Sequence, residues 1–294
     1  MTERNNLDRM TPPKEREVDP SAHNHIQTPK TSTPAAGLSF SVPTEFVDLP
    51  SKGKYYPSGH PLKGKQSVEI KYMTAKEEDI LASQNLIRRG VVFDRLLQSV
   101  MVDSINPDDL LVADKNALLV ASRITGYGHE YETEARCPSC SQKSSFTFDL
   151  TESQAYNSAN ESDMALLGVE ETSNGTFVFE LPKIECTIEV KLLNGHDEKK
   201  LAYITKAKSK NNMIESFVTD TLKSYIVSVN GDSRRETINA FVDNLPARDS
   251  RTIRNIYKTV IPQVTIRSPY ICTSCGYEEH LEVPLNADFF WPNK

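Results

Sequence analysis

The sequence contains no long hydrophobic run, and this absence excludes one class of protein. A helix that crosses a bilayer needs about 18–20 consecutive apolar residues, and no such stretch occurs in the 294 residues. The first ten residues, MTERNNLDRM, also lack the apolar segment of a secretory signal peptide. We therefore expect no membrane span, no leader and no membrane partner. We also expect reducing surroundings.

An excess of positive charge is missing too. Lys and Arg number 34 against 40 Asp and Glu, which gives a formal net charge of −6. Affinity for phosphate comes mainly from clustered cations, so this balance argues against a large nucleic-acid surface, although a local basic patch is compatible with it. The hydrophobic fraction of 38% is enough for a substantial core.

Catalytic motifs are absent as well. The chain has no G-x-S-x-G, Walker A or H-E-x-x-H pattern. The acidic pairs Glu77-Glu78 and Asp108-Asp109 lie at predicted helix starts, where they complement the helix dipole and need no catalytic role. We therefore predict that the protein is not an enzyme and has no small-molecule substrate.

Four of the five cysteines form two C-x-x-C pairs. The pairs are Cys137 with Cys140 in RCPSCSQK and Cys272 with Cys275 in ICTSCGYE. Each lies at the turn of a predicted β-hairpin, where two thiolates can converge on one tetrahedral ion. The pairs are 131 residues apart (272 − 140 − 1), against about 15–20 in ordinary zinc ribbons. The predicted cofactor is one structural zinc, provided that the insertion returns its ends to the same place.

The cysteine pairs have other interpretations. A redox C-x-x-C needs a strand-to-helix context, and neither pair precedes a predicted helix. Local disulfides across such tight turns would be strained and are disfavoured in a reducing compartment. Two alternatives to zinc remain: an iron–sulfur centre on the same cysteines, or no metal at all. His129 and His280 lie near the two turns, but we expect them to be ordinary strand residues. Four thiolates fill the coordination shell, so the site is predicted to be structural and not catalytic.

The fold class predicted is α+β: helical segments with a split zinc-ribbon-like pair of β-hairpins joined around a long, mostly helical insertion. The N-terminal arm is proline-rich and has one aromatic residue, too little apolar surface to offset the entropy of ordering. The predicted parts are a disordered arm (1–42), a strand-helix region (43–128), a split zinc ribbon (129–150 plus 263–285), a mostly helical insertion (151–262) and an aromatic C-terminal tail (286–294).

Local patterns predict several helix boundaries. Thr74 followed by Glu77 is a capping box, and Gly90 suits the C-terminal end of that helix. Ser233 followed by Glu236 predicts a second capping box. Within the insertion, GTFVFELP and IECTIEVKLL predict a hairpin with Cys186 as a small core residue.

An apolar stripe at helical spacing crosses the insertion. It runs over residues 214–229 with apolar side chains three and four positions apart. This periodicity predicts one continuous amphipathic helix.

Three adjacent aromatic residues lie close to the C-terminal end: Phe289, Phe290 and Trp291. Adjacent side chains cannot all point into one core. They either pack back onto the ribbon or anchor a partner, since buried aromatics dominate interface energetics. We treat them as candidate partner-binding residues.

Four segments carry a resemblance to a known family. They are FVDLPSKGKYYPSGHPL, EIKYMTAKEEDIL, ITGYGHEYETEARCPSC and CTSCGYEEHLEVPLNADFFWPNK. Together they resemble baseplate proteins of T-even-like contractile-tailed bacteriophages, the group associated with the central hub, over about residues 44–150 and 263–294. The resemblance implies a non-enzymatic structural or assembly role. It also implies other baseplate or hub proteins as partners, and a location in the virion tail and, during assembly, in the host cytoplasm.

The alternative function is a zinc-ribbon protein that binds nucleic acid, for example in phage transcription. Acidic side chains flank the cysteine turns, with only Arg136 and Lys143 opposing them. This local charge is unfavourable for phosphate contact. The acidic residues are Glu132, Glu134, Glu278 and Glu279.

Overall fold

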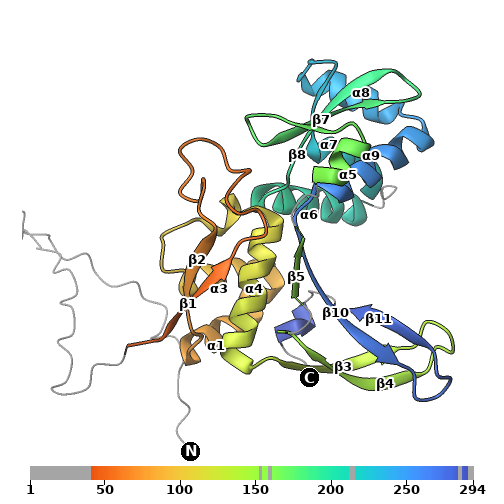
Figure 1. The fold of residues 1–294 in the computed structure, drawn as a ribbon. Coiled ribbons are helices and arrows are strands. Elements are labelled where there is room, and N and C mark those ends of the chain that lie inside the picture. The colour runs from red at the N-terminus through yellow and green to blue at the C-terminus, as the bar shows by residue number, and fades with distance from the viewer. Residues whose placement is uncertain (1–40, 152–153, 158–160, 212–215, 284–286, 291–294) are drawn as a thin grey trace, which may run out of the picture. The chain divides into compact units, whose positions relative to one another are not determined.

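The computed structural model describes residues 41–151, 154–157, 161–211, 216–283 and 287–290 (Figure 1). The predicted arm at 1–42 therefore falls almost wholly outside the described residues. Residues from Val42 onward belong to one unit. In the described ranges, no helix combines the length and the apolar character that a bilayer crossing requires.

The N-terminal region pairs two strands and packs them with short helices. Its elements are β1 (Thr44–Asp48), β2 (Ser67–Lys71), α1 (Ala75–Ala82), α2 (Gln84–Arg89), α3 (Val92–Val100), the 3-10 helix η2 (Pro107–Asp109) and α4 (Val112–Tyr127). Strands β1 and β2 are antiparallel. Apolar side chains of α3 and α4 face inward, and Leu96, Leu97 and Leu118 are completely covered.

The predicted capping box is present. The Thr74 hydroxyl accepts from the Lys76 amide at 3.3 Å, and the Glu77 carboxylate accepts from the Thr74 amide at 2.9 Å. Gly90 ends α2 in the left-handed region, with φ of 69°. The helix predicted from Thr74 to Gly90 is interrupted at Ser83, whose backbone is extended, so the segment forms two helices.

The insertion combines a sheet with five helices among its described residues. Its elements are β5 (Gln154–Asn157), α5 (Glu161–Leu166), β6 (Glu170–Glu171), β7 (Thr176–Leu181), β8 (Cys186–Lys191), α6 (Gly195–Lys210), α7 (Phe217–Tyr225), β9 (Ile226–Val229), α8 (Arg235–Asp243) and α9 (Ala247–Val260). The sheet order is β6-β7-β8-β9. The predicted hairpin is confirmed as β7 and β8, and the described part of the insertion also contains the strands β5, β6 and β9.

Two local predictions in the insertion are wrong. The stripe over 214–229 is not one helix: α7 ends at Tyr225, and Ile226–Val229 pairs with β8 as an edge strand. This run is rich in β-branched residues, which favour strand. The capping box at Ser233 is also absent. Helix α8 has no side-chain cap, and Asp232 instead accepts from the Arg234 amide at 2.9 Å.

A buried aspartate ties the loop after β1 to the start of α4. Asp114 is completely buried. It accepts hydrogen bonds from the Ser51 amide at 3.0 Å, the Ser51 hydroxyl at 2.6 Å and the Tyr56 hydroxyl at 2.7 Å. Burial raises the pKa of this carboxyl, although the hydrogen bonds oppose the rise. The bonds compensate part of the cost of removing the group from water.

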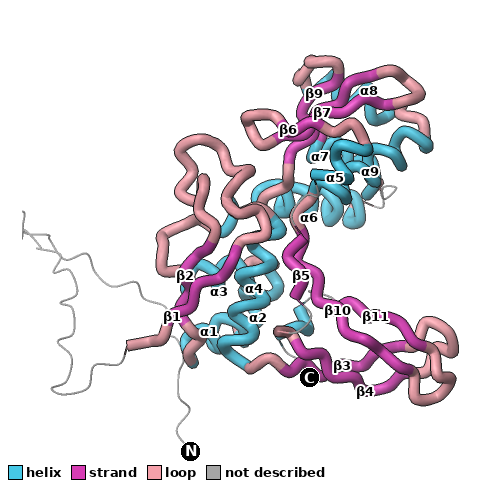
Figure 2. The backbone as a smooth tube through the Cα atoms, viewed as in Figure 1, coloured by secondary structure: helices cyan, strands magenta, loops and turns pink. Residues whose placement is uncertain are grey.

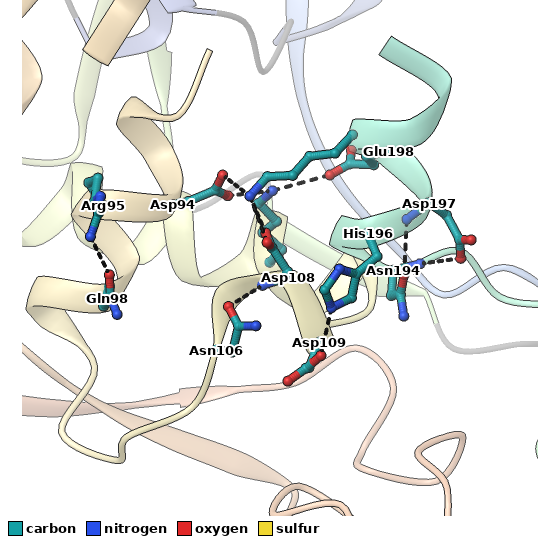
Figure 3. Close-up of polar contacts among 12 residues, drawn as sticks. Asp94, Arg95, Gln98, Asn106, Asp108, Asp109, Asn194, His196, Asp197 and Glu198 are labelled. Carbon is teal, nitrogen blue, oxygen red and sulfur yellow. Dashed lines mark hydrogen bonds and ion pairs between the residues drawn. The ribbon is translucent and has the colours of Figure 1, made fainter. Parts of the chain in front are cut away.

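An ion-pair network joins α3, η2 and α4 to α6 (Figure 3). Lys115 lies 2.9 Å from Asp94 and 3.2 Å from Glu198. Lys199 lies 2.9 Å from Asp94 and 2.5 Å from Asp108. Desolvation raises the pKa of Asp94, but hydrogen bonds and charge from the two lysines outweigh it and hold this pKa below its ordinary value. The network is therefore a specific link between the N-terminal region and the insertion.

Asp94→Asn is expected to lower the free energy of unfolding by about 2 kcal/mol at neutral pH, as for other hydrogen bonds to charged groups. A carboxyl whose folded-state pKa is depressed stabilises the fold above its unfolded pKa of about 4, and this contribution is lost as pH falls through the folded value. The difference between parent and variant should thus shrink below about pH 4. Urea unfolding across this range measures it. A difference that does not change with pH would contradict the assignment.

Candidate metal centre

Each cysteine pair closes a β-hairpin, as the sequence predicts. Strands β3 (Glu130–Arg136) and β4 (Lys143–Asp149) form the first hairpin, and β10 (Gln263–Ile271) and β11 (Glu278–Glu282) form the second. In both, the strands end just before the first cysteine and resume after the second. The turns therefore hold the thiols at the tips of two antiparallel ladders.

The first turn is fixed by its backbone. The Cys137 amide donates to the Gln142 carbonyl at 2.9 Å, and the Ser141 amide donates to the Cys137 carbonyl at 2.9 Å. Ser141 lies in the left-handed region with φ of 61°. The Cys140 amide points at the Cys137 sulfur from 3.5 Å. This closure brings the second cysteine back toward the first.

The second turn repeats the same closure. The Cys272 amide donates to the Tyr277 carbonyl at 2.8 Å, and the Gly276 amide donates to the Cys272 carbonyl at 2.9 Å. Gly276 takes the left-handed position with φ of 70°. In both turns, the amide of the first cysteine donates to the carbonyl five residues later, and its carbonyl accepts from the amide four residues later.

The four sulfurs converge. The Sγ atoms of Cys137 and Cys275 are 3.7 Å apart, as are those of Cys140 and Cys272. All four Sγ atoms lie within 4.8 Å of one another. A tetrahedral zinc with bonds of about 2.3 Å to sulfur implies edges of about 3.8 Å. The predicted ligand set is therefore brought together at a spacing that fits zinc.

Charge at the site also suits a cation. Amide hydrogen bonds from Ser274 and Cys275 lower the pKa of Cys272 to about 6. The Gln142 amide lowers the pKa of Cys140, but desolvation and the three neighbouring thiols raise it to about 12. Four sulfurs this close cannot all ionise side by side unless a cation lies among them. A divalent metal would stabilise all four thiolates.

The site is covered on one side by apolar side chains. Cys137 and Cys272 are buried, while Cys140 and Cys275 are exposed. Tyr270 is also buried, and its ring meets that of Phe146 edge-on at 5.4 Å between centroids. Four thiolates leave no open coordination position for water, so this arrangement suits a structural ion.

The insertion returns its ends through a strand pair that the sequence did not reveal. The first half of β10 pairs with β5, from Gln263 opposite Asn157 to Ile266 opposite Gln154. Its second half pairs with β11. Figure 2 shows β10 as one continuous strand along both partners. The chain therefore enters and leaves the insertion at one place, beside the cysteine hairpins.

The fifth cysteine and the two histidines near the turns lie outside the cluster of four cysteines. Cys186 is buried on β8 within the main core, which agrees with its predicted core role. His129 and His280 are exposed and do not belong to the cysteine cluster.

The aromatic residues near the C-terminal end turn inward. Phe289 and Phe290, in the 3-10 helix η3 (Ala287–Phe290), are 1% and 3% exposed. The Phe289 ring lies 5.3 Å from that of Tyr131. In this structure both phenylalanines are covered by the chain itself. Trp291 lies outside the described residues, and partner binding by this segment stays a prediction.

A buried arginine that the sequence did not single out fixes this segment. Arg123 of α4 is 3% exposed. Its Nε donates to the Phe289 carbonyl at 3.1 Å. Its other nitrogens donate to the carbonyls of Gly128, at 2.9 Å, and Glu130, at 3.3 Å. Arg123 therefore connects α4, β3 and η3 through hydrogen bonds to backbone carbonyls. No sequence motif indicates such contacts.

These features define a mixed α/β protein whose distant cysteine hairpins share one cluster. A family model described as T4 bacteriophage base plate protein matches residues 43–291. The chain belongs to this family of phage baseplate proteins. Searches of curated proteins and of solved structures gave no match. The family supports interaction with other phage tail proteins, and four clustered cysteines are compatible with a metal site.

Proposed function

We propose that this protein is a non-enzymatic structural or assembly component of the baseplate hub, stabilised by one zinc ion on Cys137, Cys140, Cys272 and Cys275. The convergence of these four sulfurs within 4.8 Å carries the zinc assignment. The family match supports the baseplate role. The protein acts in the virion tail and, during assembly, in the host cytoplasm.

The zinc acts as a clasp between the two hairpins. It joins β3-β4, which precedes the insertion, to β10-β11, which follows it. Zinc binding contributes directly to folding free energy, about 10–16 kcal/mol in small zinc-finger peptides. The clasp keeps both ends of the insertion in register and presents the chain to its partners as a preformed scaffold.

Metal analysis tests the clasp. Protein purified without added metal is expected to contain about one zinc per chain, as a closed four-cysteine site requires. Elemental analysis by mass spectrometry gives the ratio and identifies iron if an iron–sulfur centre is present. Iron in place of zinc, or a metal-free protein with four reactive thiols, would refute the assignment.

Fractionation of infected cells tests the baseplate role separately. An affinity-tagged chain should co-purify with tail proteins, and mass spectrometry of mature particles should detect it if it is a structural subunit. Presence only in assembly intermediates would indicate an assembly factor. Failure to associate with any tail component would exclude both roles without affecting the zinc result.

A further inference from the structure

A groove of about 630 Å³ lies in the insertion, between α6, α7, β9 and α8. Its lining includes the aliphatic residues Leu201, Ile204, Ile226 and Ile238. Ile226 and Ile238 are buried, whereas Leu201 and Ile204 are partly exposed. Aliphatic side chains, two of them partly exposed, therefore line an open groove.

Helix α6 has little buried surface. Of its residues from Gly195 to Lys210, Gly195 is the only one that is buried. Isolated helices of this length are marginal in water, and helices in proteins gain most of their stability from packing an apolar face. The capping box at Asn194 and the ion pairs of Lys199 hold its first turn. The apolar residues further along α6 lack an equivalent cover among the described residues.

The rim of the groove carries positive charge that is only partly neutralised. Lys191 lies 2.7 Å from Asp197, and Lys208 lies 2.6 Å from Asp220. Lys223 pairs with Asp243. Lys200 and Arg235 also line the groove, and the structure shows no acidic partner for either among the residues it describes. Two exposed cations, one on α6 and one on α8, thus line the groove beside its aliphatic residues.

We propose that this groove binds an acidic amphipathic segment of a partner protein. Aliphatic side chains of that segment would cover Leu201 and Ile204, and its carboxylates would pair with Lys200 and Arg235. Helix-in-groove recognition relies on apolar anchors, and complementary charge around them adds specificity. None of the described residues that line the groove is aromatic, which disfavours single-stranded nucleic acid because bases bind by stacking on aromatic rings. This proposal rests on the proposed baseplate role and specifies the chemistry of one partner.

A designed peptide probe tests the groove without any other baseplate protein. The probe is a fluorescent peptide of about 18 residues that forms an amphipathic helix, with Leu three and four positions apart on one face and Glu on the other. Its counterpart carries Lys at every Glu position. Fluorescence anisotropy should show binding of the acidic peptide, weakened by salt, and little binding of the basic one. Lys200→Glu with Arg235→Glu should weaken the acidic peptide at least about tenfold.

A matched variant distinguishes the groove from net charge. Lys206→Glu with Arg251→Glu makes the same charge change at two exposed positions that do not line the groove, and should leave affinity nearly unchanged. Equal weakening in both variants, or no binding of the acidic peptide, would overturn the proposal. A single-stranded oligonucleotide that binds tightly and loses affinity only in the groove variant would overturn it in favour of nucleic acid. The zinc and co-purification results are independent of these outcomes.

Discussion

Cys275→Ala is expected to release the metal and to unfold the cysteine hairpins at temperatures where the parent is folded. The variant keeps three sulfur ligands and leaves one position of the tetrahedron open. Since zinc binding contributes about 10–16 kcal/mol in small zinc peptides, losing most of it removes a free energy comparable to the usual total stability of about 5–15 kcal/mol. Zinc content by elemental analysis and thermal unfolding by circular dichroism measure the two effects together.

The effect should extend beyond the hairpins. Strand β10 pairs with β11 beside the site and with β5 at the base of the insertion. A loosened second hairpin therefore weakens the strand pair that closes the insertion. We expect faster amide hydrogen exchange in Gln263–Ile271 as well as near the cysteines.

Cys186→Ala is the matched control. It makes the same chemical change at a cysteine buried in the main core, outside the sulfur cluster. It should keep the zinc and cost only about 1 kcal/mol, a usual value for a single substitution. If Cys275→Ala retained one zinc per chain and the parent's unfolding midpoint, the shared site would be wrong. A chelator added to the parent should reproduce the Cys275→Ala behaviour.

The two cysteine turns were predictable because their signals are local. Each C-x-x-C lies between two alternating segments, and a strand-turn-strand pattern is fixed by neighbouring residues alone. Phe146 and Phe148 alternate on β4 in this way. The capping box at Thr74 is local for the same reason. Such patterns depend little on the rest of the fold.

The missed features depend on contacts between distant residues. Ile226 and Val229 fit a helical stripe equally well, and only the neighbouring β8 makes them a strand. Asp114 resembles an ordinary acidic residue in a first helical turn until Ser51 and Tyr56 surround it. Arg123 is satisfied by backbone carbonyls, which are present at every position and so leave no trace in the sequence. Tertiary context decides all three.

Phe289→Ala is expected to lower the free energy of unfolding by about 3–5 kcal/mol, the usual cost of emptying a buried aromatic site. The side chain is 1% exposed and meets Tyr131 and Phe290. Its backbone carbonyl accepts a hydrogen bond from the Arg123 guanidinium. Loss of the ring's packing therefore also weakens the position of this hydrogen bond. Urea unfolding monitored by circular dichroism gives the change directly.

Phe46→Ala provides the comparison, because Phe46 is 69% exposed on β1. The same substitution there should change stability by no more than about 0.5 kcal/mol. A large loss at Phe289 and none at Phe46 would establish that the C-terminal phenylalanines complete the core. If Phe289→Ala instead kept the parent's stability but abolished co-purification with tail proteins, the residue would be a partner anchor. This pair of variants therefore separates folding from partner binding at a position where the sequence alone allowed both.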